Sequence, residues 1–168
     1  IKAFPGAVSM SPGKDDLLAV TSVDAGTWNL TLQSIEQKTT TLLSNKVFSE
    51  PSFDKTGTQV AYIRYHNDKV RELVVYDTQN QSTVVVLRET EELGGFQSVH
   101  WSKCSNDLLL SASGATKEAS IWRVNIETKT LFEFISHPSI KVRETQDCHG
   151  YVFSLSLIHI SEPTRPIH

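Results

Sequence analysis

The sequence lacks the features of a membrane-spanning or nucleic-acid-binding segment. No apolar run approaches the roughly 18 residues that a membrane-spanning helix needs, so we expect no membrane insertion by this segment. Lysine and arginine number 16 against 19 aspartate and glutamate residues, and the formal net charge is -3. Because a surface that follows phosphates needs a basic surplus, we expect no nucleic-acid binding. The only methionine is Met10, so we expect the natural start of the protein to lie upstream.

Cysteine is scarce and histidine is scattered. The two cysteines, Cys104 and Cys148, are too few for a disulfide framework and lack metal-site spacing, so we expect two free thiols. No spacing among the histidines resembles a zinc motif. The sequence also has no Gly-x-Ser-x-Gly motif and no phosphate-binding glycine loop. It therefore predicts no catalytic residue, no metal site and no cofactor.

What the sequence does contain is a repeat of short apolar runs bounded by polar turn residues, which is an all-β pattern. Residues 50–63 align with residues 98–111, so that Phe53 matches Trp101 at an offset of 48 residues, and the offset continues without a gap to residue 135. An earlier copy places Met10 against Phe53 and residues 17–20 against 60–63. A fourth copy opens at residues 147–150. The pattern predicts about three and a half copies.

Each copy holds four short strands, and this period is typical of a β-propeller blade. We therefore predict an all-β fold, a β-propeller fragment of four-stranded antiparallel blades at approximately residues 5–46, 47–95, 96–140 and the start of a fourth at 141–154. Residues 60–65, 73–77 and 84–87 are expected in one blade, and 108–111, 121–125 and 132–135 in the next. Because 84–87 and 108–110 do not alternate, we expect burial on both faces. Asp54 and Gly57 suit a tight turn.

The first-strand motifs resemble the TolB-like propeller repeats, in which an aromatic residue precedes Ser-Pro-Asp-Gly and an apolar strand. The degenerate versions here are Met10-Ser11-Pro12-Gly13, Phe53-Asp54-Lys55-Thr56-Gly57 and Trp101-Ser102-Lys103. The resemblance covers nearly all of residues 5–154. No copy keeps the full Ser-Pro-Asp-Gly, and the Trp-Asp pair of the related WD repeats is absent.

The end of the chain has a different character. Residues 155–165, LSLIHISEPTR, match the translation of a transposase adapter used to prepare DNA libraries for sequencing, without a gap. We therefore predict that residues 1–154 are the partial propeller and that 155–168 are a non-native, adapter-derived tail.

The resemblance implies a non-catalytic interaction or sensor propeller. TolB-like repeats occur in the bacterial periplasmic TolB protein and in the extracytoplasmic part of membrane-anchored transcriptional regulators, so a periplasmic or extracytoplasmic location is expected. The alternative is a gating propeller of a prolyl-oligopeptidase-like or dipeptidyl-peptidase-like serine peptidase whose catalytic domain lies elsewhere. A propeller that is itself a glycosidase or lyase would need acids and histidines that converge on the axis, and the sequence shows no such set.

A protein partner is expected on the face that carries the longest polar loops, because loops on a rigid scaffold commonly bind. These loops are predicted at residues 66–72, 88–95, 114–118 and 136–142. The partner-binding candidates are His66, Asp68, Lys69, Arg71, Glu89, Glu91, Glu92, Lys117 and His137.

Overall fold

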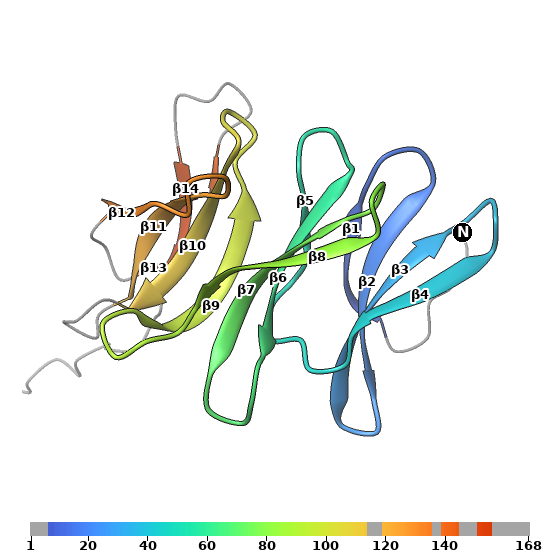
Figure 1. The fold of residues 1–168 in the computed structure, drawn as a ribbon, viewed down its shortest axis with the longest axis horizontal. Helices are drawn as coiled ribbons and strands as arrows, with labels where there is room; N and C mark the ends of the chain where they lie inside the picture. The colour runs from blue at the N-terminus through green and yellow to red at the C-terminus, as the bar shows by residue number, and fades with distance from the viewer. Residues whose placement is uncertain (1–6, 114–118, 136–138, 145–150, 156–168) are drawn as a thin grey trace, which may run out of the picture.

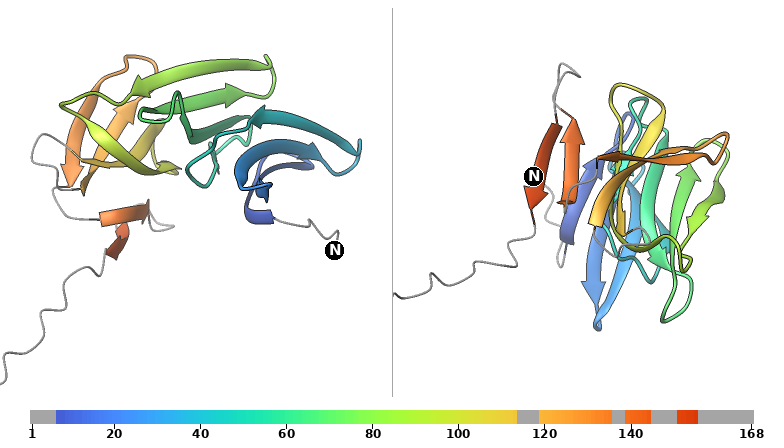
Figure 2. Two further views of the ribbon diagram at one scale, coloured as in Figure 1. Left: turned by 90° about the horizontal axis from the view of Figure 1, so that it is seen from below. Right: turned by 90° about the vertical axis from the view of Figure 1, so that its left-hand side faces the viewer.

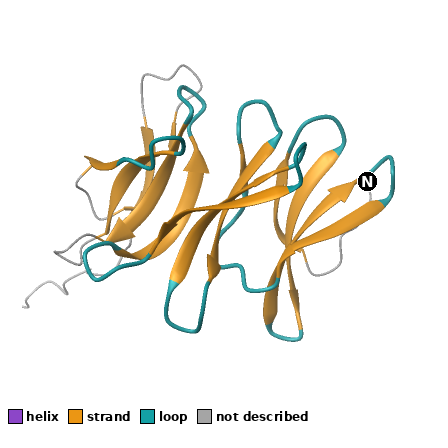
Figure 3. Cartoon of the chain, viewed as in Figure 1, coloured by secondary structure: helices purple, strands orange, loops and turns teal. Residues whose placement is uncertain are grey.

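The computed structural model describes residues 7–113, 119–135, 139–144 and 151–155. These residues form strands and turns, and the described ranges contain no helix (Figures 1 and 3). The first sheet contains β1 (Ala7–Pro12), β2 (Leu17–Asp24), β3 (Thr27–Ser34) and β4 (Thr39–Ser44). The second contains β5 (Ser52–Phe53), β6 (Gln59–Tyr65), β7 (Arg71–Asp77) and β8 (Ser82–Arg88). The third contains β9 (Gly94–Trp101), β10 (Asp107–Ser113), β11 (Ala119–Asn125) and β12 (Leu131–Ile135).

Each sheet is antiparallel with its strands in sequence order, and the sheets follow one another along an arc (Figure 2, left). A fourth, two-stranded sheet pairs β13 (Ser139–Glu144) with β14 (Tyr151–Leu155). The strands β1, β5 and β9 lie on the inner side of the arc, and β4, β8 and β12 lie on its outer side. This arrangement is that of consecutive β-propeller blades. We call the end with the β5–β6 and β9–β10 turns the turn end, and the end with the β6–β7 and β8–β9 loops the loop end.

The 48-residue repeat is confirmed as two equivalent blades. Phe53 pairs with Val60 in the second blade, and Trp101 pairs with Leu108 in the third. All six strands predicted for these two blades are present. The loops are shorter than predicted, because β7 begins at Arg71, β9 begins at Gly94 and β13 begins at Ser139.

The alignment of the first blade is wrong in register. If Met10 matched Phe53, it would pair with Leu17, but it pairs with Val20. The residue in the Phe53 position is Pro12, which pairs with Leu18 and precedes the turn. The turn accounts for one residue of this shift, since residues 13–16 connect β1 to β2 whereas five residues, 54–58, connect β5 to β6. The second strands account for the other, since Leu18 and not Leu17 takes the position of Val60. The predicted alignment matched apolar residues of the first and second copies without allowing for these differences, so its offset was wrong.

The hydrophobic core lies between the blades, as a propeller requires. One cluster joins Ile63 and Leu73 of the second blade to Phe96 and Leu110 of the third. A second joins Leu30 of the first blade to residues of the second, and a third contains Leu109 and Ile121 of the third blade. This packing confirms the burial predicted for residues 108–110.

The prediction of burial on both faces holds for residues 85–87 but not for Val84. Val85 packs against the cluster shared with the first blade, and Val86 and Leu87 pack against the cluster shared with the third. Val84 is 47% exposed, whereas Val86 is buried. Val84 pairs with Val75 near the start of β8, the outer strand of its blade, where the cover from the neighbouring blade is incomplete. A register shift opposite Leu73 and Val74 turns Val86 into the core.

The β5–β6 turn has the predicted chemistry. The Asp54 carboxylate accepts hydrogen bonds from the backbone N–H groups of Thr58 and Gln59 at 2.8 and 2.9 Å. Gly57 has a φ of +72°. A Cβ at Gly57 would lie 2.3 Å from the backbone nitrogen of Lys14, which itself donates to the Gly57 carbonyl at 2.8 Å. The glycine is thus required both by its turn and by the close approach of the first blade.

The prediction of two free thiols is wrong. Cys104, in the β9–β10 turn, is disulfide-bonded, and no described cysteine is free. The only other cysteine of the chain, Cys148, lies outside the described residues, as do Asp147 and Gly150 of the fourth copy. Spacing along the sequence failed here because a disulfide depends on which turns the fold brings together.

The described part of the chain ends with β14 at Leu155. Leu155 pairs with Ser139, so the strand runs one residue past the predicted end of the propeller at 154. Residues 156–168 lie outside the described residues, and their origin as an adapter-derived tail stays a prediction.

Candidate functional site

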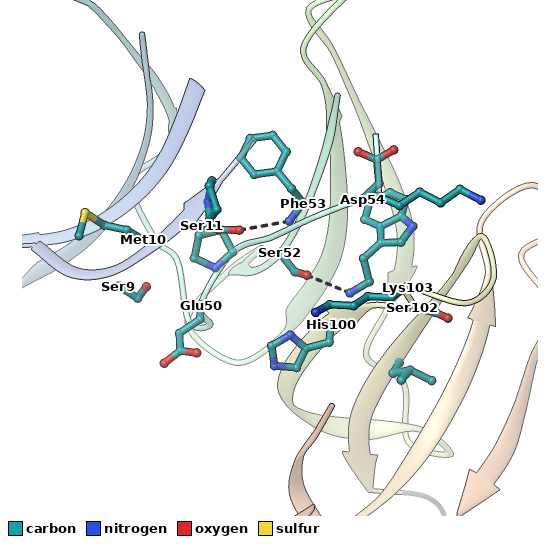
Figure 4. A pocket seen from close by; sticks show the side chains of 15 residues that line it. Ser9, Met10, Ser11, Glu50, Ser52, Phe53, Asp54, His100, Ser102 and Lys103 are labelled. Atoms are coloured by element: carbon teal, nitrogen blue, oxygen red, sulfur yellow. Dashed lines mark hydrogen bonds between the residues drawn. The ribbon is translucent and has the colours of Figure 1, made fainter. Parts of the chain in front are cut away.

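A pocket of about 620 Å³ lies on the inner side of the arc, toward the turn end (Figure 4). Its walls come from the inner strands of three consecutive blades and from the residues that follow β5 and β9. The central channel of a propeller is formed by these strands, so the pocket is part of the channel wall.

Hydrogen bonds between blades shape the pocket wall. The Ser52 hydroxyl accepts a bond from the Trp101 backbone N–H at 2.9 Å, and the Ser11 hydroxyl accepts one from the Phe53 N–H at 3.4 Å (Figure 4). Ser11, Ser52 and His100 occupy the same position in successive blades, since they pair with Ala19, Ala61 and Leu109. The third blade thus places an imidazole where the first two have a hydroxyl.

The pocket combines apolar, cationic and hydrogen-bonding groups. Lys55 and Lys103 follow the inner strands at equivalent positions, and both are exposed. Trp101 and Ser9 also line the pocket, and the Trp101 Nε1 and Ser9 Oγ atoms are buried without a hydrogen-bond partner among the described residues. Such a mixture of apolar walls and a few polar groups is typical of ligand and peptide sites.

The loop end contains a buried carboxylate surrounded by cations. Glu72, on β7, is 1% exposed. It accepts hydrogen bonds from Arg64 Nε at 3.1 Å, from Arg88 Nε at 2.9 Å and from Arg88 Nη2 at 2.5 Å. The Nδ1 atom of His66 lies 3.0 Å from the same carboxylate. We call these four residues the Glu72 cluster.

The Glu72 cluster keeps its carboxylate ionised. Burial alone would raise the pKa of Glu72, but the hydrogen bonds and charges of Arg88 and Arg64 outweigh burial and hold this pKa below its ordinary value.

Two predicted partner-binding residues, Arg71 and Glu89, form contacts within the fold and do not extend into solvent. The Arg71 guanidinium lies 3.7 Å from the centroid of the Phe48 ring and donates to the Phe96 carbonyl at 2.6 Å. The Glu89 carboxylate accepts from the backbone N–H groups of Arg71 and Phe96, each at 2.8 Å. These contacts tie β7 to the start of β9, so both residues have a structural role at the loop end.

The other candidates differ in their surroundings. His66 belongs to the Glu72 cluster, and Asp68 forms an exposed ion pair with Lys46 at 3.6 Å. Lys69, Glu91 and Glu92 are exposed on the loop end. Lys117 and His137 lie outside the described residues. The structure therefore places His66 beside the Glu72 carboxylate, pairs Asp68 with Lys46, and leaves Lys69, Glu91 and Glu92 on the surface.

Sequence reasoning missed the pocket and three members of the Glu72 cluster. Arg64, Glu72 and Arg88 are direct cross-strand neighbours, which the register of β6, β7 and β8 decides. The sequence feature that could have indicated this cluster is a charged residue at one end of each of three consecutive predicted strands. The described residues contain no group of three or more potential metal ligands and no helix long and apolar enough to cross a membrane.

The comparisons agree with a propeller fold. No protein-family model matches the chain, and no curated protein matches it either. Solved structures do match. The chain is similar to the β-propeller domain of the trilobed protease from Pyrococcus furiosus, with a TM-score of 0.62 and 14% identity over 98% of this chain and 53% of that one.

Two further structures extend this likeness. TolB from Acinetobacter baumannii matches with a TM-score of 0.69 and 13% identity over 88% of this chain and 37% of that one. The acylaminoacyl peptidase of Pyrococcus horikoshii matches with a TM-score of 0.58 and 15% identity over 79% of this chain and 26% of that one. The chain thus has a TolB-like β-propeller fold, and it spans between about a quarter and about half of the length of these neighbours.

Proposed function

We propose that this chain is part of a non-catalytic interaction or sensor propeller, and that its axial pocket receives an extended segment of a protein partner. The observation that carries the proposal is the pocket itself, because inner strands of three consecutive blades build it. An extended chain can meet successive inner strands with its alternate side chains, which is why we choose it as the occupant.

The pocket offers both anchoring and orientation to such a segment. Phe53 and Trp101 supply apolar surface, and Lys55 and Lys103 supply positive charge at the turn end. The resemblance to TolB-like repeats supports the same class of function.

We further propose an extracytoplasmic, and in a bacterium periplasmic, location. The support comes from Cys104, which is disulfide-bonded, because structural disulfides persist in oxidising compartments and are rare in the cytosol. The sequence resemblance to TolB-like repeats favours the same location.

A second candidate is the gating propeller of a serine peptidase. It is favoured by the likeness to the propeller of the trilobed protease, which covers 98% of this chain. The catalytic residues would then belong to another domain of the full-length protein. A fluorophosphonate probe that labels a serine in the full-length protein would support this candidate over the interaction propeller.

The experiment that tests the interaction propeller is site-specific photocrosslinking in the full-length protein. A photoreactive phenylalanine analogue at Lys55 should crosslink a discrete protein, and the same analogue at Lys69, on the loop end, is the matched control. The purified partner should then bind Lys55→Glu/Lys103→Glu protein at least about tenfold more weakly than wild type. Unchanged affinity, with a loss for Lys69→Glu/Glu91→Lys instead, would move the site to the loop end.

A further inference from the structure

The Glu72 cluster presents two arginines that a buried carboxylate holds in place. Arg64, Glu72 and Arg88 lie side by side on β6, β7 and β8, in direct cross-strand register. Glu72 is 1% exposed, whereas the side chains of Arg64, His66 and Arg88 are 29%, 46% and 51% exposed. The anion is therefore the buried base of the cluster, and the cations form its surface.

The two arginines of the cluster carry more positive charge than the Glu72 carboxylate neutralises. One carboxylate faces two guanidinium groups, which leaves a surplus of one positive charge before any contribution from His66. Arg88 uses Nε and Nη2 to hold Glu72, and its Nη1 has no partner among the described residues. Because the bonds to Glu72 fix the guanidinium plane, little side-chain entropy remains to be lost when an anion binds.

We propose that Arg64 and Arg88, with His66 beside them, bind a carboxylate side chain in an acidic segment of a protein partner. A single positive surplus matches a singly charged carboxylate, and the planar arginine end matches its two oxygens. A phosphate dianion would bring two negative charges close to the Glu72 carboxylate, which the surplus does not balance. The inference rests on the proposed function only in that the partner is a protein, and it concerns the opposite end of the blade from the pocket.

Neighbouring acids do not occupy the exposed side of this cluster. Asp68 pairs with Lys46, and Glu89 is held by the backbone N–H groups of Arg71 and Phe96. The exposed acids Glu91 and Glu92 follow Arg88 in the β8–β9 link, where they would repel a negatively charged partner that approached from that side. An acidic segment would therefore approach from the β6–β7 loop, past His66.

A capped hexaglutamate peptide tests the site directly, titrated into full-length protein at low ionic strength and followed by calorimetry. Arg88→Gln should weaken binding by about tenfold, since it removes one charge-assisted pair of bonds. Lys69→Gln is the matched control, because it removes an exposed charge from the same end of the blade, and Lys55→Gln is the control for the pocket. Lys69→Gln should bind the peptide within about twofold of wild type.

Three outcomes would overturn the inference. The first is an equal loss for Arg88→Gln and Lys69→Gln, which would indicate nonspecific charge attraction. The second is a loss confined to Lys55→Gln, which would leave the proposed axial site intact and place the acidic peptide there. The third is binding of a phosphoserine peptide without binding of hexaglutamate. If Arg88→Gln fails to fold by circular dichroism, Arg88→Lys replaces it, and a loss of less than about threefold for that variant counts against the site.

Discussion

The hydroxyl oxygen of Ser52 in the second blade accepts a hydrogen bond from the backbone N–H of Trp101 in the third blade, over 2.9 Å. Both residues are buried, so neither group can exchange this bond for one with water. The bond crosses the interface between two blades at the inner edge of the sheet, where the pocket begins. It links the fold of the propeller to the geometry of its candidate site.

Ser52→Ala should therefore lower the free energy of unfolding by about 1–3 kcal/mol, because it leaves a buried N–H without an acceptor. Ser11→Ala is the matched control, since its bond to the Phe53 N–H is longer, at 3.4 Å, and only partly buried. We expect a smaller loss for this variant. Urea denaturation of the full-length protein measures both, and equal losses would contradict a special role for Ser52.

Gly57→Ala should cost about 3 kcal/mol of unfolding free energy. The substitution combines the penalty of a left-handed backbone with a clash against the backbone of Lys14. Gly26→Ala separates the two terms, because Gly26 has a similar φ of +78° but nothing within 4 Å of its Cβ position. It should cost about 1 kcal/mol. Thermal unfolding checks the difference, and identical shifts would show that the blades do not approach closely at Gly57.

Glu72→Gln should lower the free energy of unfolding at neutral pH by about 1–3 kcal/mol. Because the folded-state pKa of Glu72 is depressed, its contribution is full above the unfolded-state pKa of about 4.3 and is lost as the pH falls through the folded value. The difference between wild type and variant should therefore shrink below about pH 4. Glu91→Gln, at an exposed position, should change little at any pH. A constant difference down to pH 2 would refute the ion cluster.

Cys104→Ser should reduce the free energy of unfolding by about 2–4 kcal/mol, since the disulfide no longer restricts the unfolded chain. If Cys148 is the partner, Cys148→Ser and the double variant should lose the same amount, because each removes one and the same bond. A thiol assay on denatured, unreduced protein checks the premise. Reactive thiols at full stoichiometry would show that the disulfide does not form.

One face of the first sheet carries apolar side chains that no described residue covers, and we expect residues 1–168 expressed alone to associate through it. Met10 and Leu42 lie on this face and are 56% and 60% exposed, whereas Val20 between them is 2% exposed. A propeller blade is stable when both of its faces are covered. Met10→Ser/Leu42→Ser should reduce aggregation in size-exclusion chromatography. A wild-type monomer with one sharp, reversible thermal transition would contradict this expectation.

Local features of the sequence determined the strands, the blade period and the turn chemistry. Short apolar runs bounded by polar turn residues locate β6, β7, β10 and β11, because such a run is visible in the strand's own residues. Asp54 and Gly57 were predictable for the same reason, since a tight turn is satisfied by its own side chain and its own backbone. The gapless offset of 48 residues then specified two equivalent blades, because equal spacing preserves register.

The tertiary structure alone decided which side chains meet. The register of Met10 depended on how β1 pairs with β2, and the exposure of Val84 depended on its place at the outer edge of a blade. Arg71 and Glu89 are residue types that usually lie on the surface, but here their side chains form hydrogen bonds with backbone groups of neighbouring strands. Glu72 became a buried anion only because Arg64 and Arg88 stand on either side of it. Each of these outcomes depends on side chains or backbone groups of other strands. The sequence pattern around one residue therefore does not predict its partners.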